Sequence, residues 1–126
     1  MSAKHCPFCE LPLPRIVAAN ELAVAIRDAY PVTEGHSLVI PRRHIADFFD
    51  LTAGELLACN SLLTEVRRTI CASDLTVSGF NIGVNTGADA GQTIFHCHVH
   101  LIPRRQGDVE SPRGGIRNVI PGMGSY

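Results

Sequence analysis

Gln92-Thr93-Ile94-Phe95-His96-Cys97-His98-Val99-His100-Leu101-Ile102-Pro103-Arg104 decides the fold, because this stretch holds three of the chain's six histidines. Apolar or small residues alternate with the histidines, and a period of two is typical of a β-strand. We therefore expect the histidines on one face of a sheet, about 7 Å apart along the strand, and the alternate residues on the other face. Imidazole acts as nucleophile, general acid or base, or metal ligand near neutral pH, so this face predicts a functional site.

The composition is that of an ordinary globular protein of 126 residues, with 45% hydrophobic and 18% charged residues. The formal net charge is −1, which argues against a basic surface for tRNA or duplex nucleic acid. The first residues, Met1–Pro7, lack the apolar run of a signal peptide, and no apolar stretch reaches membrane-spanning length. We expect one domain over residues 1–126, in the cytoplasm, with neither a large nucleic acid nor a membrane as partner.

The five cysteines argue against a disulfide framework, because their number is odd and no export signal precedes them. Cys6 and Cys9 form a CxxC motif, which serves either zinc binding or redox chemistry. A thioredoxin-like motif needs a helix after it, and Pro12 and Pro14 block one here. Zinc needs two further ligands from elsewhere in the chain. The other cysteines are interpreted as small core residues: Cys59, Cys71 and Cys97.

The first half of the chain predicts three strands. Residues 16–19 and 22–26 are expected to pair through a tight turn at Asn20-Glu21, since Asn tolerates the positive φ of such turns. Residues 36–41 predict a third short apolar strand, which follows Gly35 and precedes the basic residues Arg42 and Arg43.

The second half predicts one long helix and a further strand. Thr52-Ala53-Gly54-Glu55 is a capping box, and it opens a helix that runs to about residue 71 or 72. The expected apolar face of this helix consists of Leu56, Leu63, Val66 and Ile70. Residues 77–85 read as a strand with two glycines at which another group approaches the backbone.

A glycine-rich loop, residues 85–91, leads into the histidine stretch. Backbone N–H groups of such a loop, beside the neutral side chains of Asn85, Gln92 and Thr93, predict a cradle for phosphate oxygens. The tail, residues 105–126, is too rich in glycine and proline for a helix, so we expect an extended arm on the surface or on a second subunit.

The heptapeptide His96-Cys97-His98-Val99-His100-Leu101-Ile102 resembles the His-φ-His-φ-His-φ-φ signature of the histidine triad (HIT) superfamily, where φ is an apolar residue. The resemblance spans Cys6 to Arg104 and includes Asp28, residues 35–41, His44, Asn85 and residues 91–93. It implies an α+β fold, with an antiparallel sheet of about five strands, one long helix and a short helix. Residues 1–15 then form a zinc-knuckle segment of a single HIT domain. The family is commonly homodimeric.

The resemblance also implies roles for individual residues. His98 is the nucleophile, His100 binds the phosphate or passes a proton to the leaving group, and His36 supports His98 from a neighbouring strand. A structural zinc ion is implied with the ligands Cys6, Cys9, His44 and His96. The implied substrate-binding residues are Asp28 at the ribose, Ile26 beside the base, and Asn85, Gly91, Gln92 and Thr93 around the phosphate.

The implied activity is hydrolysis or transfer of a nucleoside monophosphate, with adenosine the expected nucleoside and a nucleotidyl-His98 intermediate. A phosphorylase or nucleotidyl transferase variant of this chemistry stays open. A second hypothesis is a nucleotide-binding or signalling module without physiological turnover. A third is a metal site at the triad itself. A catalytic metal would be expected to have a carboxylate ligand nearby, and the alternating pattern places no Asp or Glu on the histidine face.

Overall fold

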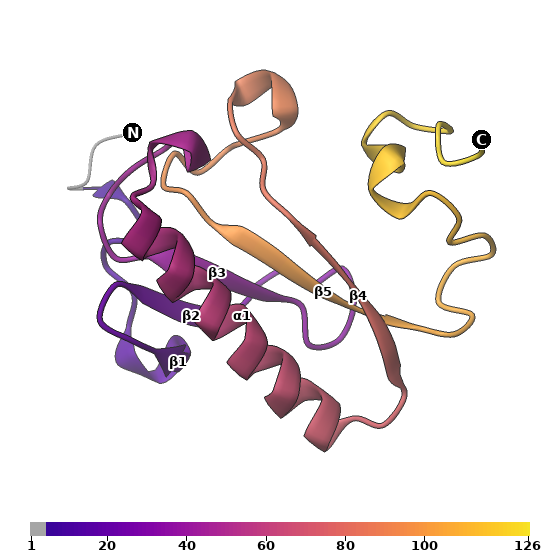
Figure 1. Cartoon of the computed structure of the whole chain (residues 1–126), viewed down its shortest axis with the longest axis horizontal. Helices are drawn as coiled ribbons and strands as arrows, with labels where there is room; N and C mark the ends of the chain where they lie inside the picture. Colours follow the sequence, from indigo (N-terminus) through magenta and orange to yellow (C-terminus); the bar gives the residue numbers. More distant parts are fainter. Residues whose placement is uncertain (1–4) are drawn as a thin grey trace.

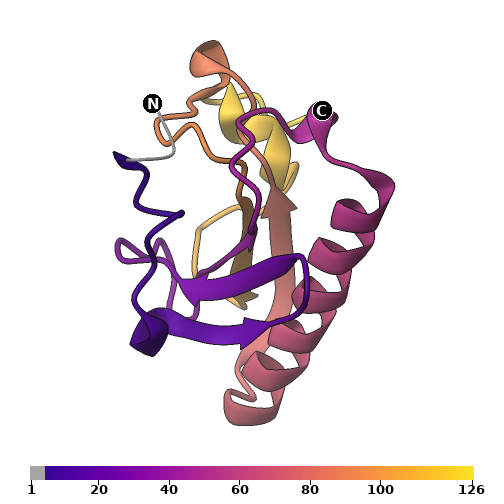
Figure 2. The ribbon, with the colours of Figure 1, turned by 90° about the vertical axis from the view of Figure 1, so that its left-hand side faces the viewer.

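The computed structural model describes residues 5–126 as a five-stranded antiparallel sheet with one long helix on one face (Figures 1 and 2). The order across the sheet is β1-β2-β3-β5-β4. In chain order the long helix lies in the connection from β3 to β4. These elements are β1 (Ile16–Ala19), β2 (Ala23–Arg27), β3 (Ser37–Pro41), α1 (Ala53–Ser73), β4 (Val77–Gly83) and β5 (Val99–Arg105). The expected fold class is confirmed, and the only short helices in the described chain are 3₁₀ turns.

The sheet separates two layers of apolar side chains. On one face, residues of β2, β3 and β5 pack against α1, with Val39, Val66 and Leu101 at the centre. On the other face, the N-terminal segment covers Ile26, Leu38 and neighbouring side chains with Cys6 and Phe8. The N-terminal segment is therefore part of the core.

The capping box is confirmed at the start of α1. The Thr52 side chain accepts from the Glu55 backbone N–H, and the Glu55 carboxylate accepts from the Thr52 backbone N–H. The expected apolar face is wrong at Leu56, which is 41% exposed. The buried residues are instead Glu55, Cys59, Leu62, Val66 and Ile70. The face that packs on the sheet is therefore turned about the helix axis, relative to the expected one, so that it includes Cys59 and excludes Leu56.

The β1–β2 turn forms as expected but for another reason. Among the residues that the structure describes, only glycines have positive φ, so Asn20 does not supply a left-handed residue. Its side-chain oxygen accepts from the backbone N–H groups of Leu22 and Ala23 at 3.1 and 2.9 Å, and this closes the turn.

Two expectations about the C-terminal half are wrong. The strand begins at Val99, so His96 and His98 lie in the irregular segment that precedes β5, with His96 at a bend. The arm is not extended throughout, because residues Gly115–Val119 form a 3₁₀ turn (η5) beside β4. Gly114 makes this possible: its φ is +81°, and a Cβ at this position would lie 2.0 Å from the Gly124 carbonyl oxygen. No helix within residues 5–126 combines the length and apolarity needed to cross a bilayer.

Candidate functional site

Four metal-ligating side chains meet where the N-terminal segment covers the sheet. Ligand atoms of Cys6, Cys9, His44 and His96 all lie within 4.8 Å of one another. His96 donates its Nε2–H to the Pro41 carbonyl at 2.7 Å, which leaves the Nδ1 lone pair facing the Cys6 and Cys9 sulfurs at 3.4 and 3.5 Å. The His44 Nδ1 lies 3.2 Å from the Cys9 sulfur. Two thiolates and two imidazoles are a donor set that fits tetrahedral zinc.

His98 has its ring fixed by the residue two positions earlier. Its Nδ1–H donates to the His96 carbonyl at 2.8 Å, and a carbonyl can only accept. Nδ1 therefore carries the proton of the neutral ring, and Nε2 keeps a free lone pair. The Phe8 ring packs edge-on against His98 with its centroid 5.1 Å away. The result is an oriented imidazole with one available nucleophilic nitrogen.

His36 and His100 form a chain of hydrogen bonds that fixes both tautomers. The Val32 backbone N–H donates to His36 Nδ1 at 3.1 Å, so Nε2 of His36 carries the proton. That Nε2–H donates to Nδ1 of His100 at 2.9 Å, which places the His100 proton on its Nε2. The carboxylate of Asp28 lies 3.5 Å from His36 Nε2.

The environment keeps this pair of rings neutral. Burial lowers the pKa of His36, and the nearby Asp28 carboxylate opposes that effect. Burial also lowers the pKa of His100, as do His98 and His36, while Asp28 again acts in the opposite direction. Both rings therefore enter the chemistry as neutral donors and acceptors at pH 7.

The histidines line a hollow of about 480 Å³, a size typical of small-molecule sites. His98, His100 and His36 all border it. Of the expected substrate-binding residues, Asp28, Asn85, Gly91 and Thr93 line it as well. Ile26 does not, because its side chain is fully buried in the sheet layer behind the wall.

Gln92 is also absent from the wall of this hollow. Its buried side chain accepts from the Gly87 backbone N–H at 2.9 Å and donates to the carbonyls of Ala46 and Ile94 at 2.9 and 3.2 Å. Gln92 thus holds the glycine loop in place, and the loop's Gly91 reaches the hollow in its stead. The sequence does not distinguish a glutamine that binds phosphate from one that holds the loop, because both roles place an amide side chain beside a glycine-rich loop.

Some residues of the site are missed by sequence reasoning. Phe8 lies against His98, the Pro41 carbonyl orients His96, and the Val32 N–H orients His36. Two of these act through the backbone, so residue type gives no signal. The proximity of Asp28 to His36 was also missed: a carboxylate does reach the histidines, from the loop after β2 rather than from their own strand.

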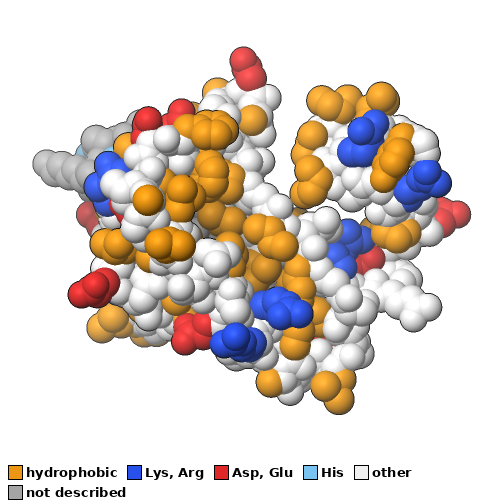
Figure 3. Space-filling view, viewed as in Figure 1, with side chains coloured by type: hydrophobic (Ala, Val, Ile, Leu, Met, Phe, Trp, Pro, Cys, Tyr) orange, Lys and Arg blue, Asp and Glu red, His pale blue; other side chains and the backbone are white. Residues whose placement is uncertain are grey.

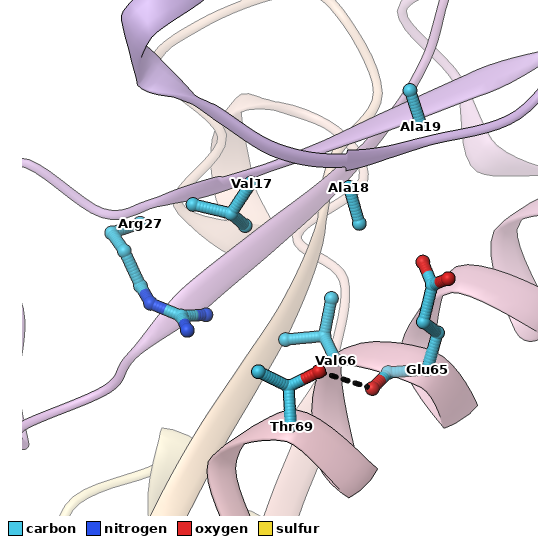
Figure 4. Close-up of a pocket in the computed structure, with 7 residues that line it drawn as sticks. All are labelled: Val17, Ala18, Ala19, Arg27, Glu65, Val66 and Thr69. Atoms are coloured by element: carbon cyan, nitrogen blue, oxygen red, sulfur yellow. Dashed lines mark hydrogen bonds between the residues drawn. The ribbon is translucent and has the colours of Figure 1, made fainter. Parts of the chain in front are cut away.

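A separate hollow of about 230 Å³ lies between β1, β2 and α1 (Figure 4). Its polar side chains are Arg27, Glu65 and Thr69, and the Thr69 hydroxyl donates to the Glu65 carbonyl of its own helix. It contains no histidine or cysteine. The histidine hollow is therefore the candidate active site.

Comparisons with known proteins identify the family of this chain. An uncharacterised HIT-like protein of Mycoplasma genitalium is 39% identical over 107 residues, which cover 82% of this chain and 75% of that protein. The asymmetrical bis(5′-nucleosyl)-tetraphosphatase of Schizosaccharomyces pombe is 37% identical over 108 residues, 83% of this chain and 58% of that enzyme. A zinc-bound histidine triad family protein from Mycobacterium smegmatis has a similar structure, with a TM-score of 0.76, 36% identity, and coverage of 87% of this chain and 82% of its own. The HIT domain model matches residues 14–107, and the chain belongs to the HIT domain family.

Proposed function

We propose that this protein cleaves a nucleoside monophosphate, with adenosine as the nucleoside, from a larger adduct through a covalent nucleotidyl-His98 intermediate. The observation that carries the proposal is the orientation of His98. Its Nδ1–H is held by the His96 carbonyl at 2.8 Å, so the nucleophilic lone pair is on Nε2 in a ring that lines the hollow. The similarity to the tetraphosphatase of S. pombe supports a nucleotide as substrate.

The proposed reaction has two displacements at the α-phosphorus. In the first, His98 Nε2 forms a bond to phosphorus and the bond to the leaving group breaks. The leaving group keeps the electron pair, accepts a hydrogen bond from His100 Nε2–H and takes a proton from the solvent. In the second, water attacks the same phosphorus and releases a proton to the solvent, and the bond to His98 breaks, which restores the neutral ring. The hydrogen bond from His36 supports His100 in both steps.

The substrate is held by groups around these histidines. Asn85, Thr93 and the backbone of Gly91 supply neutral donors to the phosphate, and they line the same hollow. Asp28 binds the ribose, since a carboxylate accepts from both the 2′- and 3′-hydroxyls. Gln92 acts at one remove by fixing the loop that carries Gly91.

A structural zinc ion held by Cys6, Cys9, His44 and His96 belongs to this proposal. When bound, it links the N-terminal segment to the bend before β5 and needs no part in the chemistry. The fit rests on the four convergent ligand atoms and on the free Nδ1 lone pair of His96. The zinc-bound relative from M. smegmatis supports the choice of metal.

Turnover assays test the proposal with a fluorogenic AMP phosphoramidate and with diadenosine tetraphosphate. We expect AMP release by the wild type and its loss, by about 10³-fold or more, in His98→Ala, with AMP binding retained. Binding without turnover in the wild type would favour the nucleotide-binding module instead. Stimulation by phosphate, with release of a nucleoside diphosphate, would indicate the phosphorylase variant.

The hypothesis of a metal at the histidines is disfavoured by hydrogen bonding. Asp28, His36 and His100 also place three ligand atoms within 4.8 Å. His36 Nδ1, however, accepts the Val32 N–H, so its Nε2 carries a proton and has no lone pair for a metal. Metal analysis of His36→Ala checks this conclusion: the metal content should stay unchanged.

The protein is further proposed to act as a homodimer. α1 and β4 expose large apolar side chains, among them Leu56, Leu57 and Ile82. Figure 3 shows hydrophobic surface gathered on the face that carries α1 and extending towards the arm. Contiguous apolar surface of this kind marks an interface. Sedimentation analysis should give twice the mass of the chain, and Leu57→Asp should reduce it.

A further inference from the structure

The hollow between β1, β2 and α1 holds charged groups that the proposed reaction does not use (Figure 4). Arg27, which lines it, follows Ala23 and Ala25 in the two-residue alternation of β2, and both alanines pack in the layer against α1. Leu38 of the histidine hollow belongs to the layer on the other face. The hollow around Arg27 therefore lies across the sheet from the catalytic histidines, and we call it the helix-side hollow.

Arg27 is a half-buried cation with little to neutralise it. Among the residues that the structure describes, its guanidinium donates only to the Ser37 hydroxyl, at 2.6 Å. Within residues 5–126 it forms no ion pair, whereas Arg43, Arg104 and Arg105 each pair with a carboxylate. Burial also lowers the pKa of Arg27. Since arginines removed from water are normally paired, the remaining N–H groups of Arg27 favour an anionic partner from outside the chain.

The wall that α1 supplies to this hollow offers acceptors. The Thr69 hydroxyl gives its single proton to the Glu65 backbone carbonyl at 3.1 Å, so its oxygen has only lone pairs left to offer. The exposed Glu65 carboxylate accepts as well and carries a negative charge. Figure 4 shows Arg27 entering the hollow from β2 and Glu65 from α1. The hollow therefore has a cationic donor end and an anionic acceptor end.

Apolar side chains supply the rest of the lining. Val17 and Ala18 of β1 and Val66 of α1 border the hollow. Val17 is 47% exposed, so an aliphatic group that enters the hollow would remove part of its side chain from water. The volume of about 230 Å³ is below the range of about 300–1,000 Å³ that is typical of sites for drug-sized ligands. The hollow thus suits a small molecule with an apolar body.

These features together define a class of ligand. A guanidinium binds a carboxylate through two parallel N–H groups, and an ammonium group donates to a carboxylate and a hydroxyl oxygen. We infer that the helix-side hollow binds a free α-amino acid with an aliphatic side chain, with its carboxylate at Arg27, its ammonium group at Glu65 and Thr69, and its side chain against Val17. This site is independent of the proposed reaction, because it shares no residue with the lining of the histidine hollow.

Three compounds of one shape test the inference by NMR titration of the wild-type protein at pH 7. L-leucine should shift the backbone N–H signals of Arg27 and Thr69 saturably, with a Kd on the order of 1 mM. Leucinamide lacks the carboxylate and 4-methylpentanoate lacks the ammonium group, so each should bind about 10-fold more weakly or less. No saturable shift with L-leucine, or equal affinity for either analogue, would overturn the inference.

Variants of the hollow assign the binding to its residues. Arg27→Met keeps the apolar stem and Glu65→Gln keeps the shape, and each should raise the Kd for L-leucine about 10-fold or more. The matched control is Arg68→Met, at an exposed arginine of α1 that does not line the hollow, and it should leave the Kd unchanged. Circular dichroism shows whether each variant is folded. Glu65→Gln, at an exposed position, keeps the test decisive if Arg27→Met does not fold.

The catalytic site provides a further control. His98→Ala should bind L-leucine with the wild-type Kd, and saturating AMP should not displace the amino acid. If either change abolishes the leucine shifts, the amino acid occupies the histidine hollow and the inference is wrong. Wild-type affinity in both Arg27→Met and Glu65→Gln would also contradict it. Absence of AMP release from every substrate would refute the proposed function and leave this inference standing.

Discussion

His96, His98 and His100 carry the same side chain, and the groups around each ring give it a different task. His96 donates a hydrogen bond from Nε2–H to a backbone carbonyl, and His98 donates one from Nδ1–H to another. His100 accepts a hydrogen bond at Nδ1 from a neighbouring histidine. His96 therefore keeps a lone pair on Nδ1 that faces two thiols, and His98 keeps one on Nε2 that faces the hollow. His100 keeps an Nε2–H that can donate a hydrogen bond. The functional difference between them therefore lies in acceptors and donors outside the motif.

Replacing His36 should impair catalysis through His100. His36→Leu removes the N–H donor to His100 Nδ1, so we expect kcat to fall about 10-fold to 100-fold. His36→Gln keeps an N–H donor and should recover part of that loss, with KM for the nucleotide little changed in either variant. Steady-state kinetics measures both effects. Equal losses in the two variants would show that His36 only fills space.

The pKa of His36 should be sensitive to Asp28. Burial places this pKa below 6.5, and the carboxylate raises it, so Asp28→Asn should move it lower still. The ring then stays neutral to a more acidic pH in the variant than in the wild type. NMR titration of the ring protons follows this directly. A pKa that rises in Asp28→Asn would contradict the arrangement.

At the scale of single elements, α1 begins with an ion pair as well as a capping box. Arg43 donates to both carboxylate oxygens of Glu55 at 3.0 and 2.8 Å, and the pKa of Glu55 falls to about 2, chiefly through this hydrogen bonding. Glu55 is 4% exposed, so the pair is largely shielded on that side. It connects the start of the helix to the segment that carries His44.

Glu55→Gln should therefore destabilise the protein at neutral pH, by about 1–3 kcal/mol. The native pKa is about 2, against an ordinary value of 4.5, so the contribution of the carboxylate is complete above pH 4.5 and is lost as the pH falls towards 2. Urea denaturation of both proteins at pH 7 and at pH 3.5 measures the difference, in which other titrating groups cancel. A difference that stays constant over this range would contradict the role of the charge.

Elements were predicted from the sequence to the extent that local pattern determines them. The capping box specified the start of α1, and alternation located the sheet strands within a few residues. Alternation failed at His96, because the Pro41 carbonyl and the thiols hold this residue in a bend before the strand. The same limit applies to Asp28, Val32 and Gln92, whose roles arise from contacts that residue type does not reveal.

At the scale of the whole molecule, the N-terminal segment closes the face of the sheet that carries the site. Cys6 is fully buried there and Phe8 contacts His98, so the metal-ligand cluster and the histidine hollow share a wall. Figure 2 shows this segment on the opposite side of the sheet from α1. Loss of the metal should therefore destabilise the fold, and catalysis should fall as a consequence of that destabilisation.

The cluster predicts one zinc ion per chain. Cys9→Ser, or treatment with a strong chelator, should remove it and lower the Tm by about 10 °C or more, because metal binding contributes to folding. Cys71→Ser is the control, since this partly buried cysteine lies outside the cluster. Elemental analysis and calorimetry provide the measurements. Unchanged zinc content in Cys9→Ser would refute this ligand set.

The covalent adduct at His98 is the most direct test of the whole account. Wild-type protein is mixed with an AMP phosphoramidate, quenched at alkaline pH within milliseconds, digested and analysed by mass spectrometry. We predict a mass increase of one AMP moiety on the peptide that contains His98, localised to that residue by fragmentation and absent in His98→Ala. An adduct on another side chain, or turnover in His98→Ala at the wild-type rate, would contradict the account.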